Sequence, residues 1–301
     1  AFTLEASAGC PPDPCFTKGQ DWGFAPLHPQ HIREDGYRYV QEYLRFQMRH
    51  TGLLRIDHVM GLHRLYWVPK GLSAAEGAYV TYHADELYAI LCLESVRHQT
   101  TLVGENLGTV PPEVNSRMDR HELRQMFVVQ YEQRPDLKAP LRIPPEHCVA
   151  SMNTHDMPTF AAHWQGKDIT DRAELGLIPK GQLKQERQTR RESNLALAEM
   201  LRREGWLAGE RPTMAAVLRA MLHWLADSPA ELLLINLEDL ILEELPQNVP
   251  GTSQERPNWR RKASFTVEEL RENAAFAEVL EEVEMIRSEA KPEQPPKRRR
   301  K

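Results

Sequence analysis

Short apolar runs, bounded by polar, Gly or Pro residues, recur along most of the chain. Runs that are almost continuously apolar over four to six residues occur at 53–57 (LLRID), 101–105 (TLVGE), 126–131 (MFVVQY), 148–154 (CVASMNT) and 231–236 (ELLLIN). This length and composition are typical of strands that are buried on both faces of a parallel sheet. The pattern therefore predicts five short strands.

Helical patterns lie between these runs. From Asp35 onward apolar residues recur at spacings of one, three and four until the TG pair at 51–52, and similar patterns cover 84–99, 111–124 and 213–227. Apolar residues at these spacings line one face of a helix. Strands that alternate with helices indicate an α/β fold with a parallel sheet.

Four further segments do not fit a simple strand–helix alternation. Residues 1–33 are rich in Pro, Gly and aromatic residues and predict an extended loop. The long segment 159–230 predicts an inserted helical subdomain before the last strand. Thr266 and Glu269 form a capping box that predicts an amphipathic helix through about Arg287. The basic run at the end of 291–301 predicts a disordered tail.

The composition of the chain disfavours several classes of protein. The chain has 301 residues, of which 41% are hydrophobic, so it can bury a sizeable core. Its net charge of −5 disfavours binding to nucleic acid or to an anionic membrane. No apolar run approaches the ~18 residues of a membrane-spanning helix, and the first residues do not resemble a signal peptide, so we expect a cytoplasmic protein. Four scattered cysteines fit neither a disulfide scaffold nor a zinc site.

Acidic residues follow three of the predicted strands. Asp57, Glu105 and Asp156 each lie at or just beyond the carboxyl end of a strand. Taken singly, such a carboxylate is more often a helix cap or part of a loop ion pair. In parallel α/β proteins, however, ligands and chemistry are placed at the carboxyl ends of the strands. Three carboxylates at that end predict a catalytic cluster.

A cluster of this kind suits glycoside chemistry. A retaining glycosidase needs two carboxyl groups about 5–5.5 Å apart, one to attack the anomeric carbon and one to protonate the leaving oxygen. A third carboxylate can stabilise the positive charge of the transition state. Glu105 follows an apolar strand and has no cation beside it in the sequence, which favours a raised pKa and a role as general acid.

Basic residues accompany the acids. Arg55 lies two residues before Asp57, on the same face of the strand, where its charge favours the ionised carboxylate that attack requires. A buried ion pair alone is weak evidence for stability, so we interpret this pair as functional. His58 and His155 each flank an acid. Alone, either would be interpreted as a capping or core histidine; beside these acids we expect them to bind substrate hydroxyls.

Five segments, in order along the chain, resemble signatures of the 4-alpha-glucanotransferases called amylomaltases or disproportionating enzymes, glycoside hydrolase family 77. The resemblance extends from about Cys10 to Lys262. The segments are CPPDPCFTKGQDWGFAPLHP, RIDHVMGLHRLYWVP, GENLGTVPPEV, NTHDMPTFAAHW and PQNVPGTSQERPNWRRK.

The resemblance implies a role for each matching residue. Asp57 is expected to be the nucleophile, Glu105 the acid/base and Asp156 the stabiliser of the transition state. Sugar-binding roles are implied for Arg55, His58, His155 and Trp22, the last as part of an aromatic loop over the acceptor site. The segment Asn258–Arg261, which includes Trp259, resembles the loop that closes the site. One departure is Asn106, at a position where the family usually has Asp.

The resemblance also implies a fold and a reaction. The fold is a TIM-type (β/α)8 barrel, of which this chain supplies about strands four to eight in residues 1–262, followed by a C-terminal helix at 263–290 and the tail. We expect such a part to be unstable or poorly active without a further N-terminal segment, because an open barrel exposes strand edges. The reaction is transfer of α-1,4-glucan segments between maltodextrins, with no metal or other cofactor.

Three alternatives remain open. The chain could be an α-glucan hydrolase, or an inactive fragment that only binds glucan. Binding of nucleic acid through the KRRRK run is disfavoured by the net charge.

Overall fold

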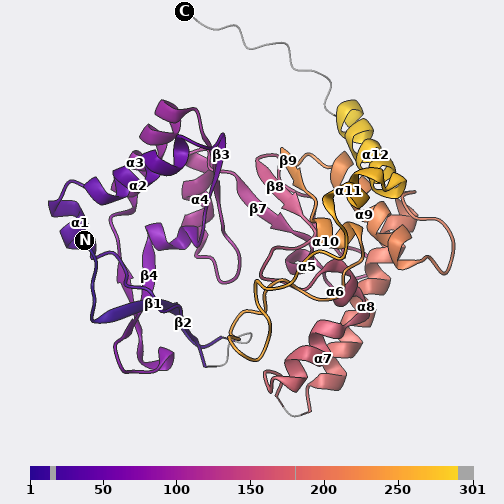
Figure 1. The fold of residues 1–301 in the computed structure, drawn as a ribbon, viewed down its shortest axis with the longest axis horizontal. Helices are drawn as coiled ribbons and strands as arrows, with labels where there is room; N and C mark the ends of the chain where they lie inside the picture. The colour runs from indigo at the N-terminus through magenta and orange to yellow at the C-terminus, as the bar shows by residue number, and fades with distance from the viewer. Residues whose placement is uncertain (14–17, 180, 291–301) are drawn as a thin grey trace, which may run out of the picture. The chain divides into compact units, whose positions relative to one another are not determined.

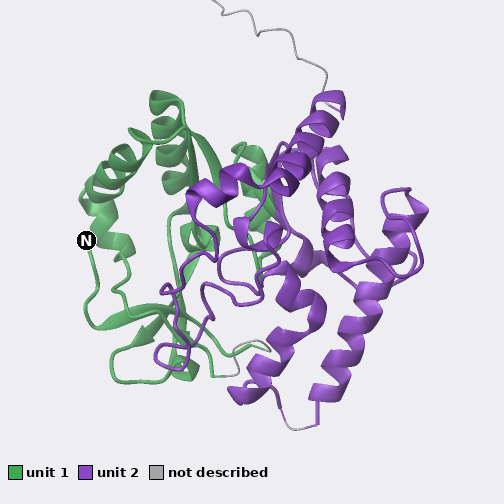
Figure 2. Cartoon of the chain, turned by 45° about the vertical axis from the view of Figure 1, so that its right-hand side comes forward, with its two compact units in different colours: residues 1–126 green, residues 127–301 purple. Residues whose placement is uncertain are grey.

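The computed structural model describes residues 1–13, 18–179 and 181–290. The chain divides into two compact units, 1–126 and 127–301 (Figures 1 and 2). Cys15 and the basic tail, predicted to be disordered, lie outside the described residues. Within those residues, no helix combines the length and the apolar composition needed to cross a membrane.

The first unit contains an antiparallel sheet that the sequence did not predict. Its strands are β1 (Ala6–Cys10), β2 (Gln20–Asp21), β4 (Arg64–Pro69) and β5 (Ala78–Thr81), in the order β2-β1-β4-β5. A short helix, α1 (Pro29–Glu34), also falls inside 1–33. The prediction of one extended loop there was therefore wrong, because β1 is held by pairing with the distant strand β4 rather than by a local signal.

The first unit also contains the predicted parallel pair. Strand β3 (Leu53–Ile56) pairs in parallel with β6 (Thr101–Gly104), and Ile56 lies opposite Gly104. Helices α2 (Arg38–Met48), α3 (Ala84–His98) and α4 (Pro112–Arg120) confirm the predicted helical segments (Figure 1). Two short 3-10 turns, η1 (Val59–Leu62) and η2 (Ala74–Glu76), complete the unit. The predicted strand–helix alternation is interrupted by β4 and β5 and holds from α3 onward.

The third sheet has the order β7-β8-β9, with β7 (Gln125–Val128), β8 (Cys148–Ser151) and β9 (Leu232–Leu234). Strands β8 and β9 pair in parallel, and every residue of β8 is buried, as predicted for a strand covered on both faces. The strand predicted over 126–131 is shorter than expected, because the chain turns into helix α5 (Val129–Glu132).

Helices cover this sheet. The segment predicted as a helical insertion contains α6 (Phe160–Gln165), α7 (Lys167–Glu174), α8 (Leu183–Arg203) and α9 (Met214–Asp227). Helix α9 supplies much of the apolar core, including the fully buried Met221, Leu222 and Leu225. Burial of side chains of this size is the main term that stabilises such a unit.

The C-terminal segment forms two helices where one was predicted. The capping box of Thr266 and Glu269 is present and begins α11 (Val267–Glu272), which ends at Asn273 before α12 (Ala274–Ala290). Helix α12 packs on α9, where Glu282 accepts a hydrogen bond from Arg219 and lies 3.0 Å from Nε2 of His223.

A buried carboxylate accepts hydrogen bonds from both ends of the loop between β8 and α6. Asp239, in helix α10 (Leu237–Leu240), is 1% exposed. Its Oδ1 accepts from the backbone N of Phe160 at 2.7 Å, and both its oxygens accept from Nδ2 of Asn153, at 3.1 and 2.9 Å. Asp239 thus holds both ends of the loop 153–160. Burial raises the pKa of Asp239 to about 6, although these two donors oppose the shift.

Gly104 allows β6 to approach its neighbours closely, and a Cβ there would lie 2.9 Å from Cγ2 of Val59 and 2.7 Å from Cε of Met118. We expect Gly104→Ala to lower the free energy of unfolding by about 1–3 kcal/mol through overpacking. Gly52→Ala is the matched control, because a Cβ at Gly52 meets no atom within 4 Å. The midpoints of urea unfolding curves measure the difference. Equal midpoints for the two variants would show that the close packing at Gly104 does not contribute to the free energy of unfolding.

Asp239 gives a pH dependence of stability whose sign can be worked out. Its folded pKa of about 6 exceeds the unfolded value of about 3.9, so between these values the folded state binds more protons. The free energy of unfolding should therefore fall by roughly 2–4 kcal/mol from this group as the pH rises from about 4 to 6.

The variant Asp239→Asn should lose this part of the pH dependence, whereas Glu281→Gln, at an exposed carboxyl group of α12, should keep it. Urea unfolding at a series of pH values measures the difference between the curves. Parallel curves for the wild type and Asp239→Asn would contradict the assignment.

Candidate active site

Asp57 lies directly after β3 and is paired with Arg55. The distance from Arg55 Nη2 to Asp57 Oδ1 is 2.7 Å, with the carboxylate side chain 77% exposed and the guanidinium side chain 33% exposed. The predicted pairing of Arg55 with Asp57 is therefore present. An ion pair this exposed adds little to stability, but the exposed oxygens of Asp57 are open to a ligand.

Glu105 lies directly after β6, next to the end of β3. Its Oε2 accepts from the backbone N of His58 at 2.8 Å, and its Oε1 accepts from the backbone N of Leu107 at 2.9 Å. Burial raises the pKa of Glu105, and the negative charge of Asp57 acts in the same direction; the two N–H donors and Arg55 oppose them. Burial prevails, which confirms the raised pKa predicted for this carboxyl group.

His58 and Trp22 lie beside these acids. His58 adopts a left-handed conformation (φ 44°, ψ 61°), which aims its N–H at Glu105. Its ring makes an edge contact with Trp22, with centroids 5.1 Å apart. Burial lowers the pKa of His58, against the opposing charge of Asp57. A neutral imidazole has one donor and one acceptor, as a ligand for hydroxyl groups requires.

The side chain of Asn106 joins an amide cluster. Its Nδ2 donates to Oδ1 of Asn115 at 2.9 Å and to Oε1 of Gln125 at 3.2 Å, and its Oδ1 accepts from the backbone N of Met126 at 2.9 Å. An Asp at this position could not donate these two bonds. The neighbouring amides therefore suit the residue found in this chain.

The second unit places His155, Asp156 and Trp259 together. Nε2 of His155 is 3.3 Å from Oδ2 of Asp156, and the rings of His155 and Trp259 have centroids 5.6 Å apart. Oδ1 of Asp156 accepts from Nδ2 of Asn248 at 2.7 Å. Trp259 is 61% exposed and has a left-handed backbone (φ 57°). This cluster offers a carboxylate beside an exposed aromatic face.

Asn258, which was predicted to bind substrate, uses its amide within its own loop. Its Oδ1 accepts from the backbone N of Val249 at 3.1 Å, and its Nδ2 donates to both oxygen atoms of Thr252, at 3.1 and 2.9 Å. These bonds shape the turn that precedes Trp259. The structure thus gives Asn258 contacts that hold the loop.

The sequence did not single out two residues that contact these clusters. Asn248 stands inside the quoted PQNVPGT segment, which was the available signal. Asp239 follows the predicted strand 231–236, as other strand-end acids do, but its bonds to the loop 153–160 are visible only in the structure. The described residues contain no group of three His, Cys, Asp or Glu side chains arranged to hold a metal ion.

Comparison with known proteins gives consistent results. The family described as 4-alpha-glucanotransferase, glycoside hydrolase family 77, matches residues 1–267. The 4-alpha-glucanotransferase of Haemophilus influenzae is 38% identical over 268 residues, 87% of this chain and 38% of that protein. That of Mycobacterium tuberculosis is 36% identical over 260 residues, 84% of this chain and 36% of that protein. The chain therefore spans less than two-fifths of the length of these curated relatives.

Solved structures agree. The crystal structure of amylomaltase from Corynebacterium glutamicum superposes with a TM-score of 0.85 at 29% identity, covering 94% of this chain and 42% of that one. Amylomaltase from Streptococcus agalactiae, in complex with acarbose, gives a TM-score of 0.71 at 18% identity over 94% of this chain and 51% of that one, a likeness of fold. Because the family match covers most of its length, the chain belongs to glycoside hydrolase family 77, the 4-alpha-glucanotransferases.

Proposed function

We propose that the chain is a catalytic part of a 4-alpha-glucanotransferase, which moves α-1,4-glucan segments from one maltodextrin to another. The observation that carries the proposal is the pair of neighbouring carboxyl groups with different environments: Asp57 is exposed and lies beside Arg55, while Glu105 is half-buried with a raised pKa. The curated relatives bear this name, and a related amylomaltase was solved with acarbose. Our proposed donor and acceptor are therefore α-glucans.

In the first step, Oδ of Asp57 attacks the anomeric carbon of the donor while Glu105 gives its proton to the leaving glycosidic oxygen. The C–O bond to the leaving glucan breaks, and a glycosyl ester of Asp57 forms. In the second step, Glu105 takes the proton of an acceptor 4-hydroxyl, whose oxygen displaces Asp57. Transfer prevails over hydrolysis when sugar rather than water occupies the acceptor position.

The remaining residues are proposed as substrate ligands. Arg55 and His58 would position the donor sugar, and the Trp22 ring would support the acceptor. Asp156 would stabilise positive charge in the transition state, with His155, Asn258 and Trp259 forming its surroundings. Contacts of Asp156 with His155 and Asn248 support this proposal, because they fix the carboxylate while leaving it about half exposed.

We further propose that residues 1–262 form part of a TIM-type barrel, about strands four to eight, with the helical insertion at 159–230 and a helical segment at 263–290. The parallel pairs β3–β6 and β8–β9 support this arrangement. Catalytic groups at the carboxyl ends of these strands are typical of such barrels. The cytoplasm remains our proposed location.

Removal of the nucleophile tests the proposal. With maltotriose, the chain should give glucose and a ladder of longer maltodextrins, and Asp57→Asn should reduce the rate of ladder formation at least about 1,000-fold. Asp85→Asn is a matched control, because Asp85 is also 77% exposed and paired with an arginine, Arg117, that is 33% exposed. Thin-layer or anion-exchange chromatography measures the products.

The same assay separates the alternatives. Glucose without longer products would favour a hydrolase. Calorimetric binding of maltoheptaose by a folded sample that forms no products would favour an inactive glucan-binding fragment.

The pH profile tests the role of Glu105. As general acid it must be protonated, so kcat/KM should fall as the pH rises through its raised pKa. Because Arg55 lowers the pKa of Glu105, Arg55→Met should move this alkaline limb to higher pH as well as lower kcat. Initial rates with maltotriose across the pH range measure both effects. A limb at the same pH in Arg55→Met would assign it to another group.

A further inference from the structure

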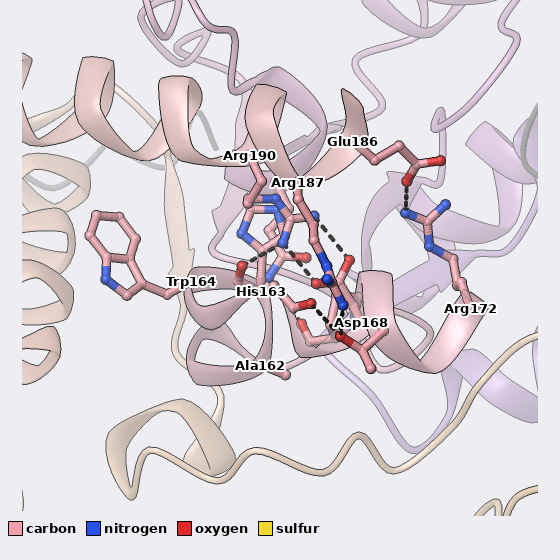
Figure 3. A network of polar contacts seen from close by, with 12 residues as sticks. Ala162, His163, Trp164, Asp168, Arg172, Glu186, Arg187 and Arg190 are labelled. Atoms are coloured by element: carbon pink, nitrogen blue, oxygen red, sulfur yellow. Dashed lines mark hydrogen bonds and ion pairs between the residues drawn. The ribbon is translucent and has the colours of Figure 1, made fainter. Parts of the chain in front are cut away.

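The second unit contains a cavity that none of the proposed catalytic residues lines. Its volume is about 290 Å³, and its walls come from the chain after β7 and from α6, α7 and α8. Figure 3 shows the polar network on these helices. This volume lies near the lower limit of about 300 Å³ for ligand sites, so it suits one sugar ring of a longer chain.

The charged groups of the wall already have partners. Nη1 and Nη2 of Arg190 donate to Oδ1 and Oδ2 of Asp168 at 2.7 and 2.9 Å, and Arg190 also donates to the backbone oxygen of His163 (Figure 3). Glu186 accepts from Arg172. Since opposite charges are paired, neither a phosphate nor a cationic ligand would find an uncompensated partner.

The imidazole in the wall is uncharged at neutral pH. Burial lowers the pKa of His163 to about 3, and the charge of Arg190 acts in the same direction. A neutral imidazole offers one donor and one acceptor. The neutral imidazole of His163 therefore favours ligands with hydroxyl groups over anions.

One buried acceptor in the wall has no partner within the described part of the chain. It is Oε1 of Gln130, while Nε2 of the same side chain donates to the backbone oxygen of Pro158 at 2.9 Å. An unsatisfied buried oxygen lowers the stability of the folded state. This oxygen has almost no exposed surface, so Gln130 contributes other atoms to the wall and a ligand in the cavity does not contact Oε1.

Further neutral polar groups line the same cavity. Gln185, Thr189 and Ser193 stand four residues apart on α8 and so share one face of the helix. Gln133 adds another amide, and Ile169 supplies an apolar contact. Carboxamides and hydroxyls that both donate and accept match the vicinal hydroxyl groups of a sugar.

We propose that this cavity binds one glucosyl residue of an α-glucan, separately from the residues proposed for catalysis. The identity of the ligand rests on the proposed function, since a glucanotransferase acts on long glucans that can contact the protein in more than one place. Paired charges exclude an anion as the preferred ligand, and the sparse apolar lining disfavours a hydrophobic one. Binding should be weak, because within the described residues the wall has no aromatic ring other than the imidazole.

Amide chemical shifts test the proposal with a site-specific readout. Maltotriose is titrated into the ¹⁵N-labelled Asp57→Asn variant, which does not turn it over, and the amides of residues 185–193 and His163 are followed. We expect saturable shifts there, and at least tenfold weaker binding at these amides in the Thr189→Val and Gln185→Met backgrounds. Gln188→Met, on the same helix, does not alter the cavity lining and should keep wild-type affinity.

Two outcomes would overturn the proposal. One is the absence of shifts at these amides, or shifts that the Thr189 and Gln185 variants leave unchanged. The other is that inorganic phosphate shifts them at lower concentration than maltotriose. Ladder formation by the wild type without these shifts would refute the cavity alone, whereas these shifts in a protein that makes no ladder would refute the proposed activity alone.

Discussion

The register of β3 against β6 determines the geometry of the candidate site. Ile56 lies opposite Gly104, and hydrogen bonds continue past both strands, from Glu105 N to Ile56 O at 2.8 Å and from Val59 N to Glu105 O at 3.0 Å. These bonds fix the backbone on both sides of Asp57 and Glu105. A shift of one residue would move either side chain to the other face of its strand. Two acids that are distant in sequence are neighbours because two short strands pair in one register.

The same register gives Asp57 and Glu105 two different environments. Asp57 is exposed beside a cation, whereas the carboxyl group of Glu105 is half-buried and accepts from two backbone N–H groups. Carboxyl groups whose surroundings favour opposite protonation states are the usual way to divide the roles of nucleophile and general acid. His58 takes part in this division, because the left-handed turn at His58 supplies one of the N–H groups that orient Glu105.

The spacing of apolar residues predicted those strands and helices whose own side chains form a buried face. The strands at 53–57 and 101–105 and helices α2, α3, α4 and α9 are marked by apolar spacing, and strand-end acids marked the candidate site. The antiparallel sheet of β1, β2, β4 and β5 was missed because its strands are short and its pairings join distant segments. The end of β7 was misplaced because Val129 is as apolar in a helix as in a strand. Asn248 and Asp239 were missed because their partners lie far away along the sequence.

Asp239 shows why a raised pKa alone does not identify a catalytic group. Like Glu105, it follows a strand and accepts a backbone N–H, and burial raises its pKa as well. Unlike Glu105, it is 1% exposed, and both its oxygens are used by Asn153 and Phe160. Substrate cannot reach such a group, so a variant at Asp239 would affect the proposed chemistry only through the loop 153–160, which carries Asp156. Accessibility, and not the shift itself, separates a proton donor from a group that positions one.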